Sequence, residues 1–190
     1  SEYGVKRGLR DEKGQGVLTG ITNISDIKAF GYRDGVKSPC DGELSYRGYN
    51  IKDLVTGGKG KRFVFEEGAY LLLFGELPTD TQLMEFQGRL SDCMELPTNF
   101  TRDVIMKAPT SDIMGSMTRS ILTLGSYDKE KESLEIPNVL RQSMQLIAVF
   151  PMLAVYAYHA YCHYEKNESM YIHRPEKDLS IAENFLRLLR

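Results

Sequence analysis

The spacing of apolar residues changes near residue 50. Before it the chain is rich in Gly, Asp, Ser and Thr, and short apolar runs are separated by the turn signals Asp34-Gly35 and Asp41-Gly42. After it apolar residues recur three and four positions apart, which is the period of a helix buried on one face. The pattern therefore predicts an all-α, mainly helical fold, in which residues 1–50 form an N-terminal arm with short strands and residues 51–190 form the helical part.

Capping residues and helix breakers divide the helical part into segments. Asn, Asp, Ser and Thr cap helix starts, and Gly and Pro end helices. The predicted helices are, in order, IKDLV after Asn50, one from near Phe65 to Gly75, one from Thr79 or Asp80 toward Pro97, one from Thr98 or Asn99 to Pro109, and one after Ser111 or Asp112. The last of these places four apolar residues on one face: Met114, Met117, Ile121 and Leu124.

The longest predicted helix runs from Asn138 to about Glu165. Its centre, LIAVFPMLAVYAY, is uncharged over residues 146–158 and has Pro151 in the middle. A membrane span needs about 18 or more apolar residues, so the prediction is a buried helix kinked at its proline.

A last helix is predicted after Ser180, because Ser180 and Glu183 have the spacing of a capping box. No clear stop signal follows before Arg190, and so short a helix is marginal by itself. We therefore expect the natural protein to continue beyond Arg190.

The composition of the chain argues against some classes of function. The chain is 42% hydrophobic and 26% charged, with a formal net charge of -2, so it offers no basic field for nucleic acid. Cys40, Cys93 and Cys162 are odd in number and form no CxxC, which favours reduced thiols. The polar first residues fit neither a secretory signal nor a transit peptide. We expect a cytoplasmic protein that binds neither nucleic acid nor membrane.

The candidate metal-binding residues are His159, Cys162 and His163. The two histidines stand four apart on the predicted long helix, so that both imidazoles point to one side. No glutamate follows His159 as in an HExxH motif, and a further ligand would have to come from elsewhere. Packing at a helix end is the favoured interpretation.

Other candidate residues also favour structural roles. The GGKGK stretch lacks the pattern of a phosphate-binding loop. Glu66 and Glu67 diverge by about 100° on a helix, so they are first-turn charges rather than an acid and base pair. Tyr46, Arg47 and Tyr49 could pair a carboxylate or hold the arm against the helices. His173 lies beside Arg174 in a polar loop and could contact a ligand or a partner. No catalytic, cofactor-binding or metal-ligating residue is therefore assigned.

Four segments together resemble the citrate synthase family. They occur in the order and spacing typical of that family, and they are GELSYRGYNIKDL at 42–54, FEEGAYLLLFGELPT at 65–79, LIAVFPMLAVYAY at 146–158 and DLSIAENFLRLLR at 178–190. The chain is similar to the N-terminal part of the large domain of a citrate synthase, most similar to the bacterial type. One departure is the segment 111–114, SDIM, where the family often has a His-Pro-Met element. Asp112 can cap that helix equally well.

The resemblance implies a mainly helical homodimeric acyltransferase of the tricarboxylic acid cycle, which condenses acetyl-CoA with oxaloacetate and needs no cofactor. In the family an aspartate removes a methyl proton, and histidines stabilise the charge that develops on oxygen. Those histidines occupy motifs of the LHADHE and GPLHGG kind, which the three histidines here do not match. The chain alone is therefore expected to be inactive. The alternatives are a 2-methylcitrate synthase fragment, which would use propionyl-CoA, and a noncatalytic helical interaction module.

Overall fold

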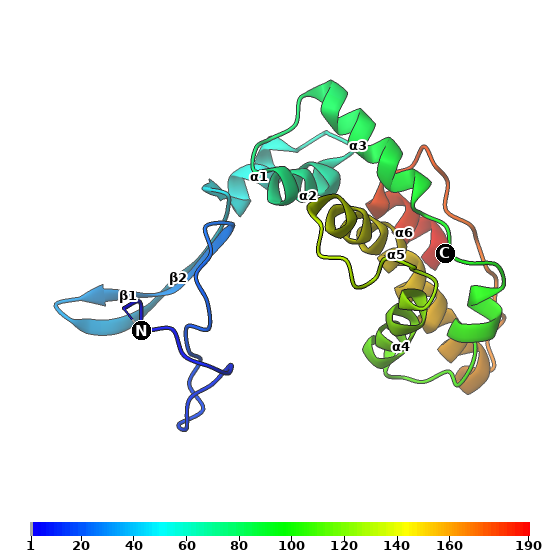
Figure 1. Ribbon diagram of the computed structural model, residues 1–190, viewed down its shortest axis with the longest axis horizontal. Coiled ribbons are helices and arrows are strands. Elements are labelled where there is room, and N and C mark those ends of the chain that lie inside the picture. Colours follow the sequence, from blue (N-terminus) through cyan, green and yellow to red (C-terminus); the bar gives the residue numbers. More distant parts are fainter. Residues whose placement is uncertain (1) are drawn as a thin grey trace. The chain divides into compact units, whose positions relative to one another are not determined.

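The computed structural model describes residues 2–190, which divide into two compact units, one reaching to Pro78 and the other running from Thr79 to Arg190. The first unit contains β1 (Ser25–Arg33), β2 (Val36–Tyr46), β3 (Tyr49–Asn50), α1 (Ile51–Gly57) and α2 (Val64–Phe74). The second contains α3 (Asp80–Asp92), the π-helical turn η1 (Thr101–Ile105), α4 (Ile113–Gly125), α5 (Ile136–Lys166) and α6 (Ile181–Leu189) (Figure 1). The predicted mainly helical fold with strands near the N-terminus is confirmed.

The strands of the first unit form one antiparallel sheet in the order β1-β2-β3. Asp34 and Gly35 both have positive φ and connect β1 to β2, as expected for a tight hairpin turn. The second predicted turn, at Asp41-Gly42, is wrong. These two residues lie inside β2, where the register between the strands shifts opposite Ala29, so they form part of a bulge.

Arg47 joins the sheet to a helix within the first unit. It lies in the turn between β2 and β3, and its Nη2 donates a hydrogen bond to the carbonyl oxygen of Leu72 at 2.9 Å. Leu72 is in the last turn of α2, where carbonyl groups lack partners within the helix and a cation is favourable. The interpretation of this cluster as holding the arm against the helices is thus confirmed for Arg47.

The capping residues predicted from the sequence begin or end helices in both units. Asn50 accepts a hydrogen bond from the amide of Lys52, and α2 ends at Gly75 in the left-handed conformation. Thr79 and Gln82 form a capping box at the start of α3. The Ser180 hydroxyl likewise accepts from the amide of Glu183 at 3.1 Å and begins α6.

Helix α5 is the centre of the second unit, because it contacts each of its other helices. Ala148, Val149, Leu153 and Ala160 are at most 1% exposed, and Pro151 lies inside the helix. By length and composition alone α5 could cross a membrane, but 44% of its most apolar window is buried in this structure, and the core helix of a globular unit passes the same test. The burial of its middle is what the sequence predicts for a core helix.

The apolar face predicted for α4 is only partly covered, because Met117, Ile121 and Leu124 are half-buried whereas Met114 is exposed. The residues of α4 that are buried are Ser116 and Ser120, one turn apart, whereas Met114 is 79% exposed and Leu122 is 73% exposed. The helix contacts α5 and η1. Its small polar side therefore faces inward, and part of its apolar side is left on the surface.

Asp112 caps α4 in a way that depends on a neighbouring glycine. Its Oδ1 accepts a hydrogen bond from the amide of Gly115 at 2.9 Å. A Cβ atom added at Gly115 would lie 2.3 Å from Oδ2 of the same carboxylate. A side chain at position 115 would therefore expel the capping group.

A network of polar side chains fastens the connection between α4 and α5. Arg141 donates to both carboxylate oxygens of Asp128 at 2.9 Å, and Gln142 also donates to Asp128. Asn138 donates to the carbonyl oxygens of Glu130 and Ser133, at 2.8 and 3.0 Å. Hydrogen bonds from Gln142 and Arg141, and from the amide of Glu130, lower the pKa of Asp128 to about 2.

Replacing Gly115 with alanine tests the cap. Gly→Ala inside a helix normally stabilises by about 1 kcal/mol, but here the loss of the Asp112 cap costs about as much, so no gain is expected. Gly88→Ala in α3 is the matched control, because its added Cβ meets nothing within 4 Å and the full gain should appear. Urea unfolding measures both variants. Equal stabilisation by the two substitutions would contradict the role of the cap.

Replacing Asp128 with asparagine tests the network. A carboxylate whose folded pKa lies below its unfolded value contributes stability above about pH 4, and this contribution is lost as the pH falls toward 2. The wild-type chain should therefore have the higher urea midpoint at pH 7, and the difference from Asp128→Asn should disappear near pH 2. Asp103→Asn, which removes an exposed ion pair with Arg102, should change the midpoint little. A difference that is independent of pH would show that Asp128 does not act through its charge.

Candidate functional site

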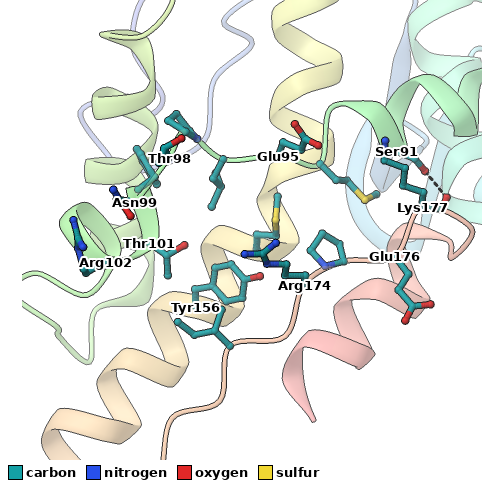
Figure 2. Close-up of a pocket in the computed structure, with 17 residues that line it drawn as sticks. Ser91, Glu95, Thr98, Asn99, Thr101, Arg102, Tyr156, Arg174, Glu176 and Lys177 are labelled. Atoms are coloured by element: carbon teal, nitrogen blue, oxygen red, sulfur yellow. Dashed lines mark hydrogen bonds between the residues drawn. The ribbon is translucent and has the colours of Figure 1, made fainter.

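A cavity of about 600 Å³ lies within the second unit. Its walls come from the end of α3, the segment that joins α3 to η1, η1 itself, the middle of α5 and the loop before α6 (Figure 2). The polar residues that line it are Ser91, Glu95, Thr98, Asn99, Thr101, Arg102, Tyr156, Arg174, Glu176 and Lys177. These segments are far apart in sequence, so the cavity is a product of the tertiary fold.

One wall of the cavity consists of backbone turned into unusual conformations. Asn99 has φ of +62°, a left-handed value that asparagine adopts more readily than most residues. The next turn, η1, is π-helical, a form that is rare and is frequently found at functional sites. Arg119 of α4 donates to the carbonyl oxygens of Val104 and Ala108 and so supports this wall from behind.

The opposite wall is the loop before α6, and buried polar side chains hold its backbone. Ser91 and Gln87 of α3 both donate to the carbonyl oxygen of Lys177, at 2.8 and 3.0 Å. Asn184 of α6 pairs with the amide and carbonyl of Glu176, both at 2.9 Å. These three side chains are almost completely buried, so the loop is fixed by directional bonds that solvent does not weaken.

Tyr156 lines the cavity from the middle of α5. Its side chain is buried on α5, and its hydroxyl donates a hydrogen bond to the carbonyl oxygen of His173. Burial raises the pKa of the Tyr156 phenol, and the positive charge of Arg174 partly opposes this rise. The phenol is therefore a neutral hydrogen-bonding group at physiological pH.

The charged residues of the lining differ in whether they have partners. Arg102 binds Asp103, Lys177 lies 3.5 Å from Asp92, and Glu176 pairs with Arg187. The guanidinium group of Arg174 makes no hydrogen bond or ion pair with any residue in the described part of the chain. In Figure 2 Arg174 lies beside the hydroxyl of Tyr156, whereas Arg102 lies at the edge of the view.

The histidines singled out from the sequence lie elsewhere. None of the three lines the cavity. The ring of His163 packs against Tyr164, and its Nδ1 lies 2.8 Å from the carbonyl oxygen of Glu168, just beyond the end of α5. The helix-end packing role is thus confirmed for His163. Across residues 2–190 no group of three or more His, Cys, Asp or Glu side chains could hold a metal ion.

Glu66 and His173, two other candidates from the sequence, do not line the cavity either. The carboxylate-bearing Glu66 lies in the first turn of α2 as predicted, but it is only 1% exposed, so it is not a surface charge. In the loop before α6, Arg174 rather than His173 lines the cavity. The sequence offered only one signal for Arg174, its position beside His173 in a polar loop, and this signal did not indicate a site.

The cavity can bind a polar ligand, but it presents no nucleophile paired with a base. Its one lining serine, Ser91, donates its hydroxyl proton to the Lys177 carbonyl. The polar and charged groups of the lining are what a ligand in the cavity would meet.

Comparison with known proteins identifies the family. The family model described as "Citrate synthase, C-terminal domain" matches residues 10–190. The chain belongs to the citrate synthase family. It is 30% identical over 182 residues to a citrate synthase of Saccharolobus solfataricus, which covers 96% of this chain and 41% of that protein. It is 32% identical over 147 residues to a 2-methylcitrate synthase of Shewanella oneidensis, which covers 77% of this chain and 36% of that protein. The chain thus spans about two fifths of these curated relatives.

Solved structures agree with this assignment. The citrate synthase of Pyrobaculum aerophilum superimposes with a TM-score of 0.71 at 26% identity, over 97% of this chain and 45% of that one. The citrate synthase of Thermoplasma acidophilum, in a ternary complex with carboxymethyl coenzyme A and oxaloacetate, shares the fold with a TM-score of 0.70 at 20% identity. The predicted resemblance to citrate synthases is confirmed. Its placement in the N-terminal part of the large domain stays a prediction.

Proposed function

We propose that the complete protein is a citrate synthase, which condenses acetyl-CoA with oxaloacetate to give citrate and CoA. The observation that carries this proposal is the 30% identity to a citrate synthase over 96% of the chain. A methyl group beside a thioester is a very weak acid, so the reaction needs a general base and donors placed where the enolate charge develops. A cytoplasmic location and the absence of a resident cofactor belong to the same proposal.

A second candidate is a 2-methylcitrate synthase, which would use propionyl-CoA. It is favoured by the 32% identity to a protein of that name over 77% of the chain. The two reactions differ by one methylene group in the acyl substrate, and a pocket can discriminate such substrates by about 10- to 200-fold.

This chain by itself contributes scaffold rather than chemistry in the proposed enzyme. His163 is engaged at the end of α5, and no histidine lines the cavity of the second unit. None of the three histidines stands in a motif of the kind that carries the family's catalytic histidines. The catalytic groups are therefore proposed to come from the remainder of the complete protein.

A thiol-release assay tests the activity. The complete protein should release CoA from acetyl-CoA in the presence of oxaloacetate, with kcat/KM at least about tenfold higher than with propionyl-CoA. The present chain alone should release none. The reverse acyl preference would support the second candidate, and an inactive complete protein would overturn both. Turnover by this chain alone would place catalytic groups among its own residues.

We also propose that the protein is a homodimer and that α4 and α5 contribute to the interface. Met114 and Leu122 are exposed on α4, two turns apart. On α5 a row at helical spacing is exposed or partly exposed, comprising Ile136, Val139, Leu146 and Phe150. Apolar surface of this extent on helices usually binds a partner.

Replacing Leu122 with glutamate tests the interface. The side chain is exposed, so the substitution should leave the fold intact while it places a charge in the apolar contact. Sedimentation at micromolar concentration should show a dimer for the wild-type chain and a monomer for the variant. Leu9→Glu, at a position that is 82% exposed outside the helices, should remain dimeric. A monomeric wild-type chain, or a dimeric Leu122→Glu variant, would contradict the proposal.

A further inference from the structure

We propose that the cavity of the second unit binds a small organic anion, a carboxylate or a phosphate ester with an apolar body, and that Arg174 binds its charged group. This inference goes beyond the proposed condensation reaction and does not depend on it. It rests on the chemistry and geometry of the lining residues.

Among the cations of the lining, Arg174 is the one with no ion pair to a described residue, which favours an anionic ligand beside it. Arg102 is held by Asp103 in two hydrogen bonds, at 2.7 and 3.1 Å, and Lys177 lies 3.5 Å from Asp92. Arg174 makes no such pair with any of residues 2–190, although a guanidinium group has five donors in a fixed planar arrangement. A carboxylate or phosphate is the partner that this geometry fits, because it can accept two parallel hydrogen bonds.

The position of Arg174 is set by the backbone on which it stands. Its neighbours Glu176 and Lys177 are bound through their main-chain groups by the buried side chains of α3 and α6, and its own carbonyl oxygen accepts a hydrogen bond from Arg187 at 3.1 Å. The hydroxyl of Tyr156 binds the preceding residue, His173. An anchored backbone lowers the cost of ordering a binding loop, so the main chain at Arg174 is already in place for a ligand, while its exposed side chain is free to turn toward one.

The rest of the lining accommodates an apolar body beside the charge. Apolar side chains come from each wall, and they are Met94, Leu96, Pro97, Phe100, Met152, Ile172 and Pro175. Thr98 and Thr101 add hydroxyl groups, and Asn99 adds an amide. One charged group, a few polar groups and an apolar surface are the usual composition of a small-molecule site.

Glu95 is the lining group that opposes this assignment. Its carboxylate is negatively charged and lies in the same cavity as Arg174, so it would repel an anion that approached it. In Figure 2 its carboxylate lies away from the guanidinium group of Arg174, and no ion pair joins the two. The carboxylate thus limits where an anionic ligand can lie, and it places the charged end of that ligand near Arg174.

Titration of the chain with three probes, followed by NMR, tests the proposal. Phenylacetate and phenyl phosphate combine an anionic group with an apolar ring, and benzyl alcohol has a similar ring without the charge. We expect both anions to bind with Kd of about 1 mM and the alcohol to bind at least about tenfold more weakly. Tighter binding of phenylacetate would identify carboxylates as the preferred ligands, and tighter binding of phenyl phosphate would identify phosphate esters.

Two variants distinguish Arg174 from general positive charge. Arg174→Gln should weaken binding of the anions by about tenfold or more, because it removes a charged hydrogen-bonding partner. Arg102→Gln is the matched control, since Arg102 lines the same cavity but is already paired with Asp103, and it should change Kd by less than about twofold. Circular dichroism checks that both variants fold. The proposal is overturned if neither anion binds at about 10 mM, if the alcohol binds as tightly as the anions, or if the two variants have equal effects.

Discussion

The second unit depends on the burial of α5. The middle of this helix is inaccessible to solvent from Ala148 to Ala160, apart from a few positions, and every other helix of the unit contacts it. Pro151 removes one backbone donor in the middle of the helix, which is tolerated because the surrounding side chains still pack closely. A helix with an apolar, buried centre gains most of its stability from tertiary contacts, so the segments around it are ordered by their contacts with it.

Polar side chains then fix the segments that the helices do not order. Ser91, Gln87 and Asn184 bind the backbone of the loop before α6, and Asn138 and Arg141 bind the connection between α4 and α5. The first three side chains and Asn138 satisfy backbone atoms that have no partner in a helix or sheet, whereas Arg141 binds the carboxylate of Asp128. The cavity lies where one of these loops meets the π-helical turn, so its shape depends on hydrogen bonds made from the core outward.

Local signals in the sequence were sufficient for most helices and their caps, but the helix predicted from Thr98 or Asn99 to Pro109 is only the short π-helical turn η1. Asn50, Thr79, Asp112 and Ser180 begin helices as predicted, because a cap needs only residues three or four positions apart. The inward face of α4 was not predictable from apolar spacing, since Ser116 and Ser120 are buried there while apolar residues remain on its surface. Apolar periodicity indicates the buried face of a helix only when all its apolar residues are covered within the same chain.

The cavity could not be predicted for a different reason. Arg174 and Thr101 are separated by more than seventy positions, and nothing in either local sequence indicates that they line one space. Their meeting depends on how α3, α5 and α6 pack, which is a property of long-range contacts. The family resemblance, in contrast, was visible because it rests on short continuous segments such as FEEGAYLLLFGELPT.

The cap of α4 also constrains how this sequence can evolve. Asp112 and Gly115 fit together so closely that a methyl group at position 115 would collide with the capping carboxylate. The stability that alanine normally adds inside a helix is therefore cancelled at position 115 as long as aspartate stands at 112. A shorter capping residue such as serine at position 112 would remove the collision and let the gain appear. The two positions form an epistatic pair, in which the effect of a mutation at one depends on the residue at the other.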